Sequence, residues 1–234
     1  MKTLTKLLFA LLFTFVTIAQ SKAQSEVIGA WQSRSGPTTF LMLVTPFYYS
    51  ITVYDTAGFK STMGGTWAVS SNNIGITTIE FCSADPSQVG KQLEANADFK
   101  GDQLETVMSG QKIAWTRIDY GNSEMAGVWQ ITGREVNGAM NTMKPGDRKT
   151  IKILTNTKFQ WIAMNTKTGE FFGTGGGSYT FKDGVYTENI EFFSRDNSRV
   201  GASLSFKGSV NGDKWDHSGK SSKGDPIHEE WTRK

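Results

Sequence analysis

Three ionisable side chains in the C-terminal half of the chain, Glu188, His217 and Glu229, have the clearest chemical potential. Carboxylates beside an imidazole can recognise the polar end of a ligand, act as general acid and base, or bind zinc. Their spacing matches no metal or nucleophile motif, so we assign no catalytic residue, no metal ligand and no cofactor. Their role depends on whether the fold brings them together.

An internal repeat organises the elements that would position them. Five blocks recur in the same order at a spacing of roughly 110 residues: 29–32 (GAWQ) with 127–130 (GVWQ), 64–67 (GGTW) with 176–179 (GGSY), 79–83 (IEFCS) with 190–194 (IEFFS), 101–102 (GD) with 212–213 (GD), and 115–117 (WTR) with 231–233 (WTR). The repeat predicts two domains, residues 24–119 and 124–234, joined by a short polar link.

The polarity pattern within each copy has a period of two, which is typical of β-strands. Leu204 and Phe206, for example, alternate with polar neighbours, and turn sequences such as 182–184 (KDG) separate the apolar runs. We expect about eight short strands in each copy and no amphipathic helix. Eight strands hide their edges most simply by closing into a small antiparallel barrel, so the predicted fold is all-β with two consecutive barrels.

Two residues in each copy carry a family resemblance. A Gly-x-Trp sequence opens each copy at Trp31 and Trp129, and each copy ends in an arginine, Arg117 and Arg233. This combination resembles the lipocalin (calycin-type) superfamily, and the second copy is similar to uncharacterised lipocalin-like domains of bacterial secreted proteins. The resemblance implies that each arginine stacks on its tryptophan to close one end of a barrel, and that a barrel encloses a cavity. It implies no established activity.

The N-terminus has the features of a secretory signal peptide. Lys2 and Lys6 precede an apolar run, and the small residues Ser21 and Ala23 predict cleavage after residue 23. Cleavage removes three of the 25 basic residues and none of the 22 acidic ones, so the mature chain has 22 of each and a nucleic-acid partner is not expected. We expect a periplasmic or secreted protein without a membrane span or lipid anchor.

A comparison of the two copies predicts which side chains face the barrel interiors, because a strand face that is apolar in both copies faces the core. In the second barrel the predicted interior, and predicted ligand-binding, residues are Trp161, Tyr186, Glu188, Trp215, His217 and Glu229. The matched interior of the first barrel contains Ile51, Thr77, Leu104, Thr106 and Ile113. Phe192 is expected to point inward as well, and Cys82 outward, with a packing role or as an exposed thiol.

We therefore expect an exported, non-catalytic protein that binds a small, largely apolar ligand with a polar end in the second barrel. Clustered carboxylates should then raise at least one pKa, and His217 should hold its proton to higher pH than usual. Several alternatives stay open. The ionisable groups could form an internal network that fills the barrel, or a metal or haem site. The protein could instead dock an envelope partner, or be an enzyme that uses Glu188 or His217 as acid or base.

Two further interpretations concern charged residues outside the predicted pocket. Glu191 lies three residues from Glu188, so the two point to opposite faces of a strand and do not form a glycosidase pair. We expect Glu191 on the outer face, where its replacement should have almost no effect. The lysines between residues 144 and 158 are interpreted as a solvated face.

Overall fold

The computed structural model describes residues 25–70, 74–108 and 110–234, nearly all of which lie in antiparallel strands or the turns between them. The predicted signal peptide, residues 1–23, lies outside the described residues. Within the described part of the chain, no helix is long and apolar enough to cross a membrane.

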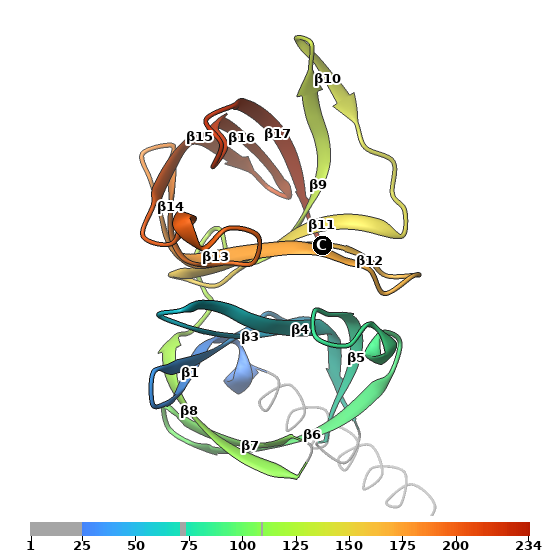
Figure 1. Cartoon of the computed structure of the whole chain (residues 1–234), viewed down its shortest axis with the longest axis vertical. Helices are drawn as coiled ribbons and strands as arrows, with labels where there is room; N and C mark the ends of the chain where they lie inside the picture. Colours follow the sequence, from blue (N-terminus) through green and yellow to red (C-terminus); the bar gives the residue numbers. More distant parts are fainter. Residues whose placement is uncertain (1–24, 71–73, 109) are drawn as a thin grey trace, which may run out of the picture.

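The N-terminal half forms a closed barrel in which each strand pairs with the next and the last pairs back to the first (Figure 1). Its strands are β1 (Gly29–Ser35), β2 (Thr38–Val44), β3 (Tyr48–Asp55), β4 (Gly58–Val69), β5 (Gly75–Cys82), β6 (Gln92–Lys100), β7 (Gln103–Met108) and β8 (Gln111–Asp119). A short 3-10 turn, η1 (Pro86–Gln88), joins β5 to β6.

The C-terminal half forms a second barrel, which closes through the pairing of its last strand with its first. Its strands are β9 (Gly127–Val136), β11 (Arg148–Leu154), β12 (Lys158–Asn165), β13 (Phe171–Lys182), β14 (Val185–Phe193), β15 (Ser203–Asn211), β16 (Lys214–Lys220) and β17 (Pro226–Arg233), with η2 (Asn197–Arg199) after β14. An additional strand, β10 (Ala139–Thr142), pairs with the far half of β9. The predicted pair of eight-stranded antiparallel barrels is confirmed.

The predicted tryptophan–arginine contacts close one end of each barrel. The guanidinium of Arg117 lies 3.9 Å from the ring centre of Trp31, and that of Arg233 lies 4.1 Å from the ring centre of Trp129. Each guanidinium also donates hydrogen bonds to backbone carbonyls of the segment just before the first strand of its barrel. The same end of both barrels is therefore sealed by a cation–π contact and an anchored N-terminal segment.

The repeated Gly-Gly sequence marks a β-bulge at the same place in both barrels. The register shifts between Gly64 and Gly65 in the first barrel, and between Gly176 and Gly177 in the second. A Cβ atom at Gly65 would lie only 2.0 Å from the carbonyl oxygen of Thr78, and one at Gly177 would lie equally close to a carbonyl oxygen of β14. Glycine is needed because the backbones approach so closely.

The bulge also changes which side chains of the following strand face inward. Phe193 contacts Trp161 inside the second barrel, with ring centres 5.5 Å apart. Phe192 instead points toward the first barrel, where its ring centre lies 5.0 Å from that of Tyr54. The predicted inward position of Phe192 is therefore wrong, because simple alternation fails at a bulge. Cys82 is buried, in agreement with a packing role and not with an exposed thiol.

The two barrels pack against each other through an apolar interface. Figure 1 shows β3 and β4 of the first barrel facing β11, β12 and β13 of the second. The buried side chains of this cluster come from both barrels: Ala30, Leu41, Leu43, Tyr48, Tyr54, Phe81, Val128, Ile151, Ile153, Ile162, Met164 and Phe192. The outer faces of these strands are therefore buried. They are apolar because, like the barrel interiors, they are removed from water.

Charged and polar side chains cross this interface as well. The Tyr54 hydroxyl donates to Glu191 at 2.9 Å, and the Lys149 ammonium donates to Glu80 at 3.0 Å. Glu191 lies on the outer face of its barrel as predicted, but that face is an interface between barrels and not a solvated surface. Its replacement is therefore not the silent change expected from the sequence.

The interpretation of the lysines between 144 and 158 as a solvated face is wrong for three of them. Lys149 pairs with Glu80 across the interface, and Lys158 pairs with Glu191 at 2.5 Å. Lys152 is only 5% exposed and points into the second barrel. Strand β11 is buried on both faces, so its lysines are positioned by ion pairs and not by solvation.

Candidate functional site

Five of the six predicted ligand-binding residues are buried inside the second barrel: Tyr186, Glu188, Trp215, His217 and Glu229. The ring centres of Tyr186 and Trp215 lie 4.9 Å apart, and those of Trp215 and His217 lie 5.0 Å apart. The side chains thus touch one another. They fill the interior, instead of lining an open pocket there.

The sixth residue, Trp161, lies at the opposite end of this barrel from the sealed one. It is half-buried and borders an open polar depression together with Arg134, Arg195 and Glu229. Strand pairing places Trp161 opposite Lys152, so it belongs to the interior face of β12. The structure therefore brings Trp161 to the edge of the buried group and not into its centre.

A residue that the sequence analysis missed, Lys152, lies in the centre of the group. Its ammonium donates to a carboxylate oxygen of Glu188 at 2.8 Å, and both side chains are about 95% buried. The ammonium also lies 5.0–5.8 Å from the ring centres of four aromatic residues, Tyr186, Phe206, Trp215 and Trp231. A buried charge requires such a partner, and the aromatic faces add cation–π attraction.

His217 lies beside a second ion pair, that of Glu229 with Arg134. Its Nδ1 lies 3.6 Å from Glu229, whose other oxygen accepts a 2.6 Å hydrogen bond from Arg134. Burial and the nearby charge of Lys152 lower the pKa of His217. Burial alone would raise the pKa of Glu229, but its contact with His217 and the positive charges of Lys152 and Arg134 outweigh burial and hold that pKa at about 2.

These directions are opposite to the expected ones. We expected repulsion between carboxylates to raise the pKa of at least one of them, and their negative charge to make His217 hold its proton. Instead, burial of the His217 ring and the unforeseen charge of Lys152 lower the pKa of His217, and nearby positive charges lower that of Glu229. The geometry favours a filled interior held by two ion pairs, Lys152–Glu188 and Arg134–Glu229. It is not a fully connected network, because three buried side chains, Tyr186, Trp215 and His217, have polar atoms without a hydrogen-bond partner in the described chain. No cluster of three or more histidine, cysteine, aspartate and glutamate side chains in the described residues could hold a metal ion.

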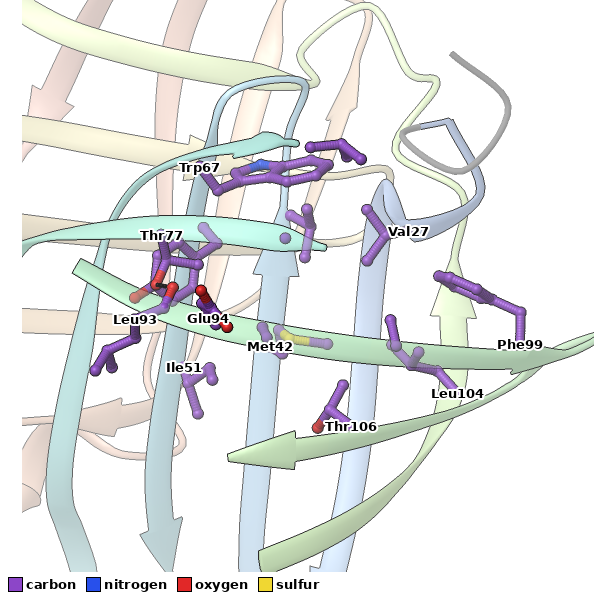
Figure 2. A pocket seen from close by; sticks show the side chains of 16 residues that line it. Val27, Met42, Ile51, Trp67, Thr77, Leu93, Glu94, Phe99, Leu104 and Thr106 are labelled. Atoms are coloured by element: carbon purple, nitrogen blue, oxygen red, sulfur yellow. Dashed lines mark hydrogen bonds between the residues drawn. The ribbon is translucent and has the colours of Figure 1, made fainter. Parts of the chain in front are cut away.

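The first barrel, in contrast, contains a cavity of about 440 Å³. Figure 2 shows Val27 and Trp67 at one end of this cavity and Ile51 and Thr106 deeper in the barrel. The lining is mostly apolar: Val27, Met42, Val44, Tyr49, Ile51, Trp67, Val69, Gly75, Thr77, Leu93, Glu94, Ala95, Ala97, Phe99, Leu104 and Thr106. A volume of this size lies within the usual range of small-molecule sites.

The cavity exists because the first barrel has small side chains where the second has large ones. Gly75 pairs with Ala95 across β5 and β6, and the pair at the same place in the second barrel is Tyr186 with Phe206. Leu104 pairs with Trp115, whereas Trp215 takes the place of that leucine in the second barrel. The two barrels thus share a backbone plan, and side-chain volume alone leaves one hollow and the other filled.

The segments that precede the first strand of each barrel also differ in side-chain volume at the sealed end. In each barrel the first tryptophan donates its indole N–H to the carbonyl four residues earlier, which belongs to Val27 in the first barrel and Met125 in the second. Met125 is 1% exposed and fills the end of its barrel, whereas Val27 lines the cavity. A shorter side chain at this position leaves the space beneath it open.

Few polar groups reach the cavity. Thr77 donates its hydroxyl hydrogen to the Leu93 carbonyl at 3.2 Å, and Thr106 accepts a hydrogen bond from the Trp115 indole at 2.9 Å. The Trp67 indole donates to the Thr45 carbonyl at 2.9 Å, which fixes its ring at the end of the cavity. Apolar contact dominates the site.

Of the residues predicted inside the first barrel, Ile51, Thr77, Leu104 and Thr106 line this cavity. Ile113 is only partly buried and packs beside the interior cluster. The sequence contained the signal for the cavity, since Gly75 already aligns with Tyr186. The ionisable residues of the second barrel pointed to the wrong interior, because a cavity depends on the volume of the interior side chains and not on their charge.

Comparisons with known proteins assign no activity to this chain. Residues 124–234, which include the second barrel, match a family model described as "Domain of unknown function (DUF4488)". No curated protein matches the chain. Among solved structures, the β clamp of Helicobacter pylori bound to a DNA ligase peptide aligns over 87% of this chain, with 8% identity and a TM-score of 0.16. The chain covers 57% of that protein's length, and a similarity this weak supports no statement about fold or function.

Proposed function

We propose that this is a non-catalytic binding protein that holds a small apolar molecule inside its first barrel. The observation that carries the proposal is the 440 Å³ cavity, which is lined mainly by aliphatic and aromatic side chains. A water molecule occupies about 30 Å³ in the liquid, so this cavity holds about 15 non-hydrogen atoms at liquid density. Transfer of an apolar molecule of that size from water into the cavity is favourable, since it removes apolar surface from solvent.

This proposal differs from the expectation of a polar-ended ligand in the second barrel. There the side chains of Tyr186, Trp215 and His217 occupy the space that a ligand would need. We propose that the filled barrel supports the hollow one through their shared interface, where the outer faces of β3 and β12 bury apolar side chains.

We further propose that the barrels are lipocalin-like and that the protein is exported to the periplasm or the medium. The cation–π contacts of Arg117 with Trp31 and of Arg233 with Trp129 support the first point. The charged, apolar and small-residue segments before residue 24 support the second.

The test fills the cavity with the side chains that the second barrel already uses. N-phenyl-1-naphthylamine, an uncharged fluorophore that brightens in apolar surroundings, is titrated into the wild-type protein and into Ala95→Phe combined with Leu104→Trp. We expect one bound fluorophore per wild-type chain and at least about a tenfold loss of affinity in the filled variant, because the added rings occupy the site. The matched control is Phe206→Ala, which alters the equivalent position of the second barrel and should leave this affinity unchanged.

Equal binding by the wild type and the filled variant would refute the site. Failure of the wild type to bind the fluorophore would favour the rival function, a protein that docks an envelope partner through its outer surface. Circular dichroism of each variant verifies that the barrels are still folded.

A further inference from the structure

The cavity of the first barrel has no positive charge to offer a ligand. Among the described residues that line it, Glu94 is the only charged one, and it is exposed to solvent. Met42 in the first barrel occupies the position of Lys152 in the second. Met42 pairs with Trp31 on one side and Ile51 on the other. Lys152 pairs in the same way with Trp129 and Trp161. A ligand carboxylate would therefore be buried without a cation to pair with it.

The cavity does contain one hydrogen-bonding group that is not used by the protein. Tyr49 lines the cavity and is 5% exposed, and its hydroxyl makes no hydrogen bond of normal geometry to a described residue, although the Thr77 hydroxyl lies close enough to lower its pKa against the larger effect of burial. The two threonine hydroxyls of the lining, Thr77 and Thr106, already bond to Leu93 and Trp115. A buried hydroxyl without a partner is unfavourable, so an acceptor supplied by a ligand would be stabilised there.

The second barrel shows that the fold does not need this hydroxyl. Tyr49 pairs with Gly65 of the repeated Gly-Gly sequence, and the residue that pairs with the matching Gly177 is Phe159. Phe159 is fully buried in the filled barrel. A hydroxyl at this position thus occurs only in the hollow barrel, although the filled barrel buries a different tyrosine hydroxyl, that of Tyr186, without a partner in the described chain. Burial raises the pKa of Tyr49, so the group remains a donor over the physiological pH range.

We propose that the first barrel selects an uncharged apolar ligand with a single oxygen acceptor, such as a long-chain alcohol or ketone, and rejects the carboxylate of equal length. This inference rests on the proposed binding function. The Tyr49 hydroxyl donates to the ligand oxygen, and the apolar body of the ligand contacts side chains such as Leu104 and Phe99.

The experiment compares 1-decanol with decanoate as competitors of N-phenyl-1-naphthylamine, both below their aggregation limits and at about pH 8, where the acid is ionised. We expect decanol to displace the fluorophore at a concentration at least about tenfold lower than decanoate, because the carboxylate loses its hydration without gaining a partner. Acidification toward the pKa of decanoic acid should reduce this difference, since the neutral acid regains affinity.

Two matched variants identify the donor. Tyr49→Phe removes only the hydroxyl, introduces the residue found in the second barrel, and should weaken decanol binding about fivefold. The control is Ser50→Ala. Ser50 is the neighbouring residue, and its buried hydroxyl also has no partner in the described chain, but it does not line the cavity. This variant should leave decanol binding unchanged.

The outcomes separate this inference from the function on which it rests. If decanoate competes as well as decanol, or if Tyr49→Phe leaves decanol binding unchanged, the selectivity is refuted. The binding function still stands in that event, provided that the cavity-filling variant abolishes binding of the fluorophore. If the wild type binds no fluorophore at all, both are refuted.

Discussion

Replacement of Lys152 by methionine tests whether the second barrel is held by its buried ion pair. Methionine is the residue at this position in the first barrel, so its shape is compatible with the fold. The change leaves the Glu188 carboxylate, which is 4% exposed, without its 2.8 Å partner. Removal of one member of a buried ion pair costs about 3–5 kcal/mol, and we expect Lys152→Met to lower the free energy of unfolding by that amount.

The matched double variant distinguishes a buried charge from simple loss of packing. Lys152→Met combined with Glu188→Thr gives the second barrel the uncharged pair of the first, Met42 and Thr77. No charge is then left unpaired, so the double variant should lose only about 1–2 kcal/mol, from the smaller volume of threonine.

Urea-induced unfolding followed by circular dichroism measures these free energies from the midpoint and slope of the transition. A loss below about 1 kcal/mol in the single variant would refute the reasoning, because a loss that small is characteristic of a solvated ion pair. A double variant as unstable as the single one would also refute it, since packing and not charge would then explain both.

Three further predictions concern other parts of the chain. Burial lowers the pKa of His217, so below about pH 6.5 the unfolded state binds more protons than the folded state. The free energy of unfolding should therefore fall as the pH falls from about 6.5 toward the lower pKa of the folded state. Urea unfolding at several pH values should show a smaller decrease in His217→Thr than in the wild type. Glu191→Gln should lower the free energy of unfolding by about 1–2 kcal/mol, because it weakens the hydrogen bond from Tyr54. In a double-mutant cycle with Tyr54→Phe the two losses should be coupled, and additive losses would contradict this contact between the barrels. The intact mass of the exported protein should correspond to a chain that begins at Gln24, and retention of residues 1–23 in the soluble fraction would contradict export.

The repeat made most of the fold predictable. Two copies of one strand pattern predicted two barrels, and the paired positions placed Tyr186, Glu188, Trp215, His217 and Glu229 in one interior. These predictions succeed because side-chain direction alternates strictly along a regular strand. Phe192 fails for the same reason, since it follows the bulge at which alternation is interrupted.

The polarity pattern of its strand does not reveal that Lys152 faces the barrel interior, because in this strand the apolar side chains face outward and the charged one faces inward. Ile151 and Ile153 face the other barrel, while the lysine between them faces its own interior. A strand buried on both faces has no solvent side to define inward and outward, so a charged residue there looks exposed. The cavity was missed for a different reason, because a void depends on the summed volume of several side chains and not on any one residue type.

The interface between the barrels explains how the two interiors could become so different. Residues at matching positions meet across it: Phe59 stacks on Phe171 at a ring-centre distance of 6.4 Å, and both follow the turn that precedes the repeated Gly-Gly strand. Contacts of this kind are typical of an isologous dimer, here between two halves of one chain. Because the outer faces of the strands hold the halves together, the inner faces are free to vary. One interior is then filled by packed aromatic rings around a paired charge, while the other keeps a cavity.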